Sequence, residues 1–562
     1  MLTAAVAVVP LVWLDVLAGG AAMTLEHVAM FPLMLAVMLR RRDEYMTHHP
    51  TRRRSMRPVR FLARLSGALL AVLLLPAAVG VAGTRASLAS LYQPREDTVA
   101  VAATPPAHDP AKATAAILIG PQGANAADTL GPYQILATTG AFNLYTVAPE
   151  RRPLPLTGGL DLVPDLTFAE LDRRLGPTGA ADVVIVPDMP KTEPVVTWLQ
   201  QQRQQHQAHG TVLLSVCYGA KVLAKAGLLD GRDATTSWLG ISRLARRHPA
   251  VTWHHGTRYV EDANIISTAA VLSGVDGALR VVERLLGAPA AGAAARAIGW
   301  RHYAPGDPAS IPVAKLSRED TVAGLNLAFR PHPTIGVLLT DGVGELELAS
   351  AFSPYTEQSY AARTLALGTG QAVRTAHGLT FVPRASLRGA GDRVDRLIVP
   401  GAQAARRRDP RLVALGRAEG FTPIYLHERP GFAYDAALRD IARTFDAPTA
   451  RHAAKRLEYP VAAAADLAGP GVPPTVLLRP FLLGLAGLAV AIGIDRLLRA
   501  RRHRRRAARA VLAPATDRGP SPRATTQARR SAIHHRNTDG AWTPHRRHQR
   551  NHERPMLPGR QG

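Results

Sequence analysis

The sequence contains one cysteine, Cys217, among 562 residues, and this scarcity excludes two classes of site. A single thiol cannot form a disulfide within the chain, and it cannot supply a Cys-x-x-Cys metal site. The globular part of the chain also lacks a strong net charge. Of the formal charge of +25, +7 lies on residues 40–64 and +14 on residues 499–562, which leaves +4 elsewhere. We therefore expect no direct DNA binding by the folded domains, because they lack a basic footprint.

The N-terminal region also lacks the basic segment that begins a secretory signal peptide. Residues 1–39 instead predict one or two membrane segments. Residues 65–83 and 473–494 are each apolar enough and long enough to cross a bilayer. The sequence thus predicts a multi-pass protein of the cell membrane.

Arginine-rich segments set the expected orientation, because such segments stay in the cytoplasm. Residues 40–64 precede one predicted span and residues 499–562 follow the other, so the residues between the spans should be extracytoplasmic. The tail has few apolar residues and is expected to be disordered and cytoplasmic. Membrane lipid is its expected partner, and nucleic acid is the alternative.

The region around the cysteine predicts a nucleophile elbow. An apolar strand, TVLLSV, ends at Cys217, and a helix, KVLAKA, follows. The sharp turn needs small residues two positions before and after the nucleophile, which Ser215 and Gly219 supply. Such a turn aims backbone N–H groups at the sulfur and should favour the thiolate. The alternative is a cysteine buried at a strand end like a small apolar residue.

The surrounding sequence alternates between short apolar strands and helices, which is typical of a doubly wound parallel α/β sheet. The expected strands are Ala115–Ile119, Asn143–Val147, Val183–Val186 and Thr211–Val216, with a helix near Thr129–Gly140. Ligands of such sheets bind beyond the carboxyl ends of the strands. Asp128, Asp188 and Cys217 are therefore expected to share one crevice.

The chain then repeats itself. The repeated segments are GPY at 131–133 and SPY at 353–355, GLDLVP at 159–164 and GLTFVP at 378–383, and DVVIVP at 182–187 and DRLIVP at 395–400. Three matches in one order indicate a duplicated module. The second copy has His427-Glu428 where the first has its cysteine, so we expect it to be degenerate. We expect the two modules to pair within the chain, with a homodimer as the alternative.

Residues 216–238, VCYGAKVLAKAGLLDGRDATTSW, resemble the elbow region of the ThiJ/PfpI superfamily. Within it, they are most similar to the isonitrile hydratases and to the sensor domain of AraC-type regulators. The similarity covers roughly residues 114–290 well and 334–460 partially. It implies a flavodoxin-like, class I glutamine amidotransferase-like α/β fold in two copies. It also implies a small-molecule ligand or substrate and no cofactor or metal.

The resemblance also assigns site residues. An acidic residue on the first loop faces the cysteine in this superfamily, and Asp128 occupies that position; the alternative is that Asp128 only caps the following helix. The N–H groups of Cys217 and Tyr218 are candidate oxyanion donors. Gly123, Asp188 and Gly219 are candidate binding residues.

Three departures from the superfamily pattern weaken the case for catalysis. Tyr218 replaces the usual His or Thr, Asp188 replaces a glycine after Pro187, and Ser237 replaces a histidine before Trp238. No third member of a triad is evident. Two hypotheses follow: a cysteine-dependent hydrolase or hydratase acting on a small electrophile, or a ligand sensor that does not turn over. The AraC-type regulators add a helix-turn-helix module, and no convincing one is found here.

The expected organisation follows from these segments. The predicted parts are membrane segments at 1–39, a basic loop at 40–64, a membrane helix at 65–83, a linker at 84–112, the cysteine-containing domain at 113–290, a linker at 291–333, the second module at 334–460, a membrane helix at 473–494 and the basic tail at 499–562.

Overall fold

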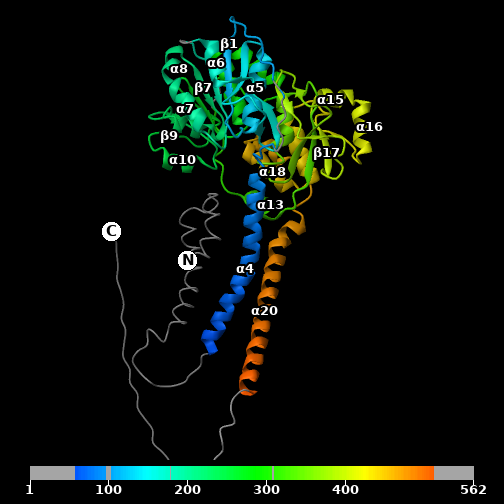
Figure 1. The fold of residues 1–562 in the computed structure, drawn as a ribbon. Coiled ribbons are helices and arrows are strands. Elements are labelled where there is room, and N and C mark those ends of the chain that lie inside the picture. The colour runs from blue at the N-terminus through cyan, green and yellow to red at the C-terminus, as the bar shows by residue number, and fades with distance from the viewer. Residues whose placement is uncertain (1–56, 96–100, 102, 177–178, 307–308, 512–562) are drawn as a thin grey trace, which may run out of the picture. The chain divides into compact units, whose positions relative to one another are not determined.

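The structure is a computed structural model that describes residues 57–95, 101, 103–176, 179–306 and 309–511 (Figure 1). The predicted membrane segments at 1–39 and most of the basic tail lie outside the described residues. Both sheets described below belong to one compact unit, which ends at Arg496, and the described residues 497–511 fall in a second unit.

The first domain is built on a seven-stranded sheet with the order β10-β11-β7-β6-β1-β2-β5. The strands are parallel apart from β10, which is antiparallel to β11. Their bounds are β1 Ala113–Leu118, β2 Phe142–Ala148, β5 Leu166–Thr167, β6 Val183–Val186, β7 Val212–Ser215, β10 Tyr259–Asp262 and β11 Ile265–Thr268. The central strands β1, β6 and β7 are mostly apolar and, apart from Ala113, buried, which is typical of strands covered on both faces. The predicted parallel α/β sheet is confirmed.

Helices cover both faces of this sheet (Figure 1). Helices α5, α11 and α12 pack together on one face, whereas α6 and α9 contact the sheet from the other and α7 packs on α9. The bounds are α5 Ala126–Thr139, α6 Phe168–Leu175, α7 Glu193–Gln201, α8 Arg203–His209, a 3-10 turn Cys217–Gly219, α9 Ala220–Lys225, α10 Ile241–Arg247, α11 Ser273–Leu286 and α12 Ala288–Ala297. A two-stranded sheet of β8 (Asp233–Ala234) and β9 (Thr252–Trp253) completes the domain.

A second sheet of five parallel strands follows, with the order β16-β13-β12-β17-β18. Its strands are β12 Thr334–Leu338, β13 Arg363–Gly368, β16 Ala385–Ser386, β17 Arg396–Val399 and β18 Ile424–Tyr425. Its helices are α13 Arg318–Phe329, α14 Glu345–Phe352, α15 Ala402–Arg407, α16 Pro410–Ala418, α17 Ala433–Thr444, α18 Ala447–Leu457 and α19 Val461–Ala465. Taken in chain order, these five strands occupy the same places as β1, β2, β5, β6 and β7 of the first sheet. The predicted linker at 291–333 contains the last part of α12 and all of α13, so nearly half of it is helical.

The two α/β regions meet through a shared four-stranded sheet, β14-β15-β4-β3. Each region supplies one hairpin: β3 (Leu154–Leu156) with β4 (Leu160–Val163), and β14 (Val373–Arg374) with β15 (Thr380–Val382). The two hairpins join where β15 runs antiparallel to β4, with Phe381 opposite Leu162. Helices α5 and α14 also pack against each other. One continuous apolar core therefore spans both regions.

Two long apolar helices flank the α/β regions in sequence. Helix α4 (Arg57–Ala89) and helix α20 (Pro474–Val511) each contain a stretch long and apolar enough to cross a membrane. Gly484 and Gly487 of α20 lie directly against the backbone of Val72 and Ala71 of α4. Helix α4 extends beyond the predicted span of 65–83 at both ends. Helix α20 continues through residues 499–511, a part of the predicted disordered tail that is therefore helical.

Candidate active site at the Cys217 elbow

Cys217 sits at a strained turn directly after strand β7. Its backbone φ is 53°, in the left-handed region that residues with a Cβ rarely adopt. The Val216 N–H donates to the Val186 carbonyl (3.0 Å), which continues the sheet to the turn. The Thr236 hydroxyl donates to the Cys217 carbonyl (2.7 Å) and holds the turn from the other side. Strain of this kind persists where surrounding contacts enforce it, and it is concentrated at functional sites.

Gly219 is required by packing at this turn. A Cβ at Gly219 would lie within 3.0 Å of the Val186 carbonyl oxygen, so the elbow closes against β6 only with glycine here. Ser215, the other small residue of the pattern, is fully buried. Both small residues that the elbow prediction rests on therefore lie in close packing around the turn.

Asp128 is a buried carboxylic acid, and one of its oxygens has no hydrogen-bond partner in the part of the chain that the structure describes. The cap of α5 is Asn125, whose side chain accepts from the N–H groups of Ala127 and Asp128. The alternative that Asp128 only caps this helix is therefore wrong. Oδ2 of Asp128 accepts from the Asp188 N–H (3.2 Å), whereas Oδ1 is buried without a hydrogen-bond partner. A buried oxygen without a partner is costly, and a proton or a ligand would satisfy it.

Burial dominates the acid–base chemistry of this pair. It raises the pKa of Asp128 well above its usual range, and the Asp188 carboxylate adds to the shift. Burial also raises the pKa of the Cys217 thiol, with further contributions from Asp128 and Asp188. The Tyr218 N–H acts in the opposite direction, because it stabilises the thiolate, but it does not outweigh burial. Both directions oppose the thiolate that the elbow predicted, and they favour a thiol beside a protonated carboxyl group.

The remaining predicted site residues surround this pair. Asp188 forms an ion pair with Lys221 of α9 (2.6 Å). Tyr218 points its ring toward Gly240, where a Cβ would collide with the ring. Gly123 adopts a φ of 95° and packs against the Pro155 carbonyl, so it shapes the first loop. Asp128, Asp188, Cys217 and Tyr218 are brought together, as their mutual effects on pKa show.

Three residues outside the first domain also reach this site. Glu357 is buried and accepts hydrogen bonds from Asn125 (3.3 Å) and Thr157 (3.2 Å). Tyr92 follows α4; burial raises its pKa, and Asp188, Glu357, Asp128 and Cys217 raise it further. Arg456 of α18 has Tyr218 and Cys217 among the groups that raise its pKa. These residues lack a motif and lie far from the elbow in sequence, so sequence analysis missed them.

The corresponding place in the second sheet holds a histidine with fixed partners. His427 follows β18 and is buried. Its Nδ1 accepts from the Gly401 N–H (3.0 Å), so the proton of the neutral ring is on Nε2, which faces the Ser350 hydroxyl (3.1 Å) and the Ala433 carbonyl (3.3 Å). Burial lowers the pKa of His427 and keeps the ring neutral. A histidine held in this way fills the place without offering a nucleophile.

Among the described residues, no cluster of His, Cys, Asp or Glu side chains could hold a metal ion.

Comparisons with known proteins place residues 113–284 in a known family of sequences. A sequence model described as the DJ-1/PfpI family, also called ThiJ, matches residues 113–284. The isonitrile hydratase of Pseudomonas putida is 29% identical over 213 residues, covering 37% of this chain and 89% of that protein. An uncharacterized protein in the cpoL 5' region of Streptomyces lividans is 33% identical over 127 residues, covering 22% of this chain and 86% of that protein. A solved structure of an AraC family transcriptional regulator from Pseudomonas putida is 21% identical, with a TM-score of 0.29, covering 33% of this chain and 98% of that one.

Proposed function

We propose, from the premise that this chain belongs to the DJ-1/PfpI family through residues 113–284, that it is a membrane-anchored, cofactor-free cysteine hydrolase or hydratase acting on a small electrophile. One observation carries the proposal: Cys217 is held at a strained elbow beside the buried, partner-free oxygen of Asp128. A nucleophile with an adjacent proton-handling group is the minimum that covalent catalysis requires. The relative named isonitrile hydratase supports a substrate with an electrophilic carbon bonded to nitrogen.

The proposed chemistry needs only residues of this chain and water. Once Asp128 is deprotonated, its Oδ1 takes the proton from the Cys217 thiol as sulfur attacks the substrate carbon. With an isonitrile, the terminal carbon keeps the electron pair after sulfur bonds to it, and Asp128 returns the proton to that carbon, which gives a thioimidate. Water then adds across the C=N bond, with its oxygen on carbon and one proton on nitrogen. The C–S bond breaks as the carbonyl forms, and the hydroxyl proton returns to sulfur, which releases a formamide and the free thiol. The Tyr218 N–H faces the sulfur and is positioned to stabilise charge that develops beside it.

A kinetic experiment tests this function. The full chain in detergent micelles is incubated with a panel of small isonitriles, amides and esters, and product formation is followed by chromatography. Turnover should be lost in Cys217→Ser and reduced at least about a hundredfold in Asp128→Asn, since removing a positioned acid–base group costs that much. Equal turnover by the wild type and Cys217→Ser would refute the proposal.

A second element of the proposal is that residues 334–460 are a degenerate copy of the first domain and act as its built-in partner. The shared strand order, the three sequence repeats and the pairing of corresponding hairpins support this. His427 is held by the Gly401 N–H at the place of the cysteine, so such a copy would have no nucleophile of its own. A half-sized sheet with exposed edges would be unstable alone, and pairing with the first domain covers it.

A third element is the membrane anchor. Two apolar helices, α4 and α20, support it, together with the arginine-rich segments next to them. The positive-inside rule then places both α/β regions outside the cytoplasm. A reporter fused at residue 300 should be active outside the cytoplasm, and one fused at residue 520 should be active inside. The reverse pattern would contradict this orientation.

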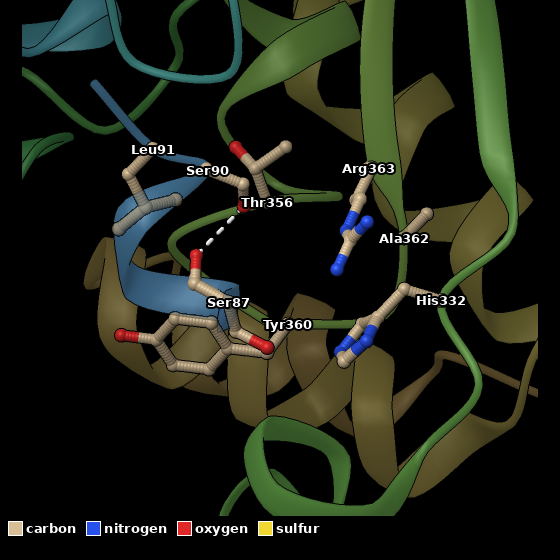
Figure 2. A pocket seen from close by; sticks show the side chains of 8 residues that line it. All are labelled: Ser87, Ser90, Leu91, His332, Thr356, Tyr360, Ala362 and Arg363. Carbon is tan, nitrogen blue, oxygen red and sulfur yellow. Dashed lines mark hydrogen bonds between the residues drawn. The ribbon is translucent and has the colours of Figure 1, made fainter. Parts of the chain in front are cut away.

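One observation favours the alternative function, a ligand sensor. Tyr92 lies three residues beyond the end of α4 and shares the site of Cys217 and Asp128. Just before it in the chain, Ser87, Ser90 and Leu91 line a small pocket with His332 and Arg363 of the second α/β region (Figure 2). A ligand that displaced Tyr92 would pull on the end of the membrane helix. If the protein is a sensor, Tyr92→Ala should weaken signalling while leaving alkylation of Cys217 intact.

A further inference from the structure

The end of helix α18 is anchored on the first domain next to the elbow. The Leu272 N–H donates to the Leu457 carbonyl (3.0 Å). The Glu458 carboxylate accepts from the Ala270 N–H (2.9 Å) and from the Ser273 hydroxyl. These contacts fix the residue that precedes them, Arg456, relative to the Cys217 site.

Arg456 is a cation without a carboxylate. Its guanidinium donates to the Tyr360 hydroxyl (3.2 Å), and no ion pair to it is present among the described residues. The neighbouring cations differ: Lys455 pairs with Asp320, and Arg258 pairs with Asp276. Burial would lower the pKa of Arg456, but Tyr360, Tyr218 and Cys217 raise it, so it remains charged. Arg456 is half-buried, and its guanidinium lies 5.6 Å from the centre of the Tyr360 ring. A partly desolvated charge with no carboxylate partner among the described residues would be stabilised by an anionic ligand.

The acids around the elbow are already satisfied or neutral. Asp188 is paired with Lys221 (2.6 Å), and Glu357 accepts from four hydrogen-bond donors, among them Ser353 and Thr356. Asp128 Oδ1 is buried and has no hydrogen-bond partner among the described residues. The site therefore offers a small molecule one acid–base group, one thiol and one free positive charge.

We propose that Arg456 binds the anionic group of the substrate, so that the Cys217 site selects small electrophiles that carry a carboxylate. This rests on the proposed function, and it assigns to the second α/β region a residue that contacts the substrate. Arginine suits this role because its planar guanidinium can hold a carboxylate through two hydrogen bonds.

Two alkylating agents of nearly equal size test the charge preference. Iodoacetate carries a carboxylate and iodoacetamide does not. Both alkylate Cys217, the chain's one cysteine, by forming an S–C bond as iodide leaves. Intact-mass kinetics on the full chain in micelles give the ratio of the two rates. Arg456→Gln should lower the iodoacetate-to-iodoacetamide ratio about tenfold, which corresponds to about 1.4 kcal/mol. Arg456→Lys should retain part of the preference for iodoacetate. Arg439→Gln, which changes an exposed arginine on α17, should leave the rate ratio unchanged.

A binding measurement separates this inference from the cysteine chemistry. Sodium acetate should raise the melting temperature of the wild type by about 2 °C over sodium chloride of equal ionic strength, and this rise should vanish in Arg456→Gln. A reactive thiol with an unchanged rate ratio in Arg456→Gln would overturn the inference and leave the proposed function standing. An unreactive thiol with acetate stabilisation that depends on Arg456 would support the inference and refute the cysteine chemistry. Absence of both effects would refute both.

Discussion

Removal of the Asp161 charge should destabilise the whole α/β unit, because this carboxylate ties its two halves together. Asp161 of β4 is fully buried. It accepts two hydrogen bonds from Arg384 of the second region (2.9 and 2.7 Å) and one from Arg95 of the linker (3.1 Å). Asp161→Asn preserves the shape but leaves the Arg384 guanidinium, 13% exposed, without its carboxylate. Breaking a buried pair in this way costs about 3–5 kcal/mol.

The assay is thermal unfolding of the full chain in micelles. Asp161→Asn should lower the melting temperature by roughly 5–10 °C. The matched control is Glu150→Gln, which removes the carboxylate of an exposed pair with Arg152 and should change it by less than about 2 °C. The wild type should unfold in one transition because the core is continuous. An Asp161→Asn shift no larger than that of the control, or two independent transitions in the wild type, would refute the reasoning.

Two further predictions concern the elbow and the pH dependence of stability. Gly219→Ala should destabilise the domain by about 1–3 kcal/mol, because its Cβ would collide with the Val186 carbonyl, and denaturant titration would measure this against Gly324→Ala, whose Cβ meets open space. Burial raises the pKa of Glu458 from 4.5 to about 7, so the folded state prefers the protonated acid. This contribution to stability is complete below the unfolded pKa and is lost as the pH rises through 7. Between pH 5 and pH 8, the free energy of unfolding should therefore fall about 2 kcal/mol less in Glu458→Gln than in the wild type. An equal fall in both proteins would contradict a raised pKa for Glu458.

The parts of this protein that could be predicted from sequence are those encoded by local pattern. Strand β6 was expected and found at Val183–Val186, since a short apolar run followed by proline has little freedom to be anything else. The elbow followed from Ser215 and Gly219 around Cys217. The ionisation of the thiol could not be predicted, because it depends on how deeply the turn is buried. Arg456 could not be predicted either, because it reaches the elbow only through the packing of α18 on the first domain.

The role of Asp128 shows the same limit at shorter range. A capping residue and a site residue look alike in sequence when both are acidic and precede a helix. The structure separates them because Asn125 takes the cap and leaves Asp128 facing inward. The local pattern identified the right loop, whereas the side-chain roles depended on where the helix begins.

Alkylation of Cys217 as a function of pH tests the central claim most directly. The full chain in micelles is treated with iodoacetamide, and intact mass reports a single adduct, which should be absent in Cys217→Ser. We predict a midpoint above the ordinary thiol pKa of about 8.5, because burial and the Asp128 charge oppose ionisation. Asp128→Asn should lower that midpoint, because Cys217 would then ionise without a neighbouring Asp128 carboxylate to oppose the negative charge. Failure of the folded protein to react at any pH, while the denatured protein reacts, would show a buried structural cysteine and contradict the account.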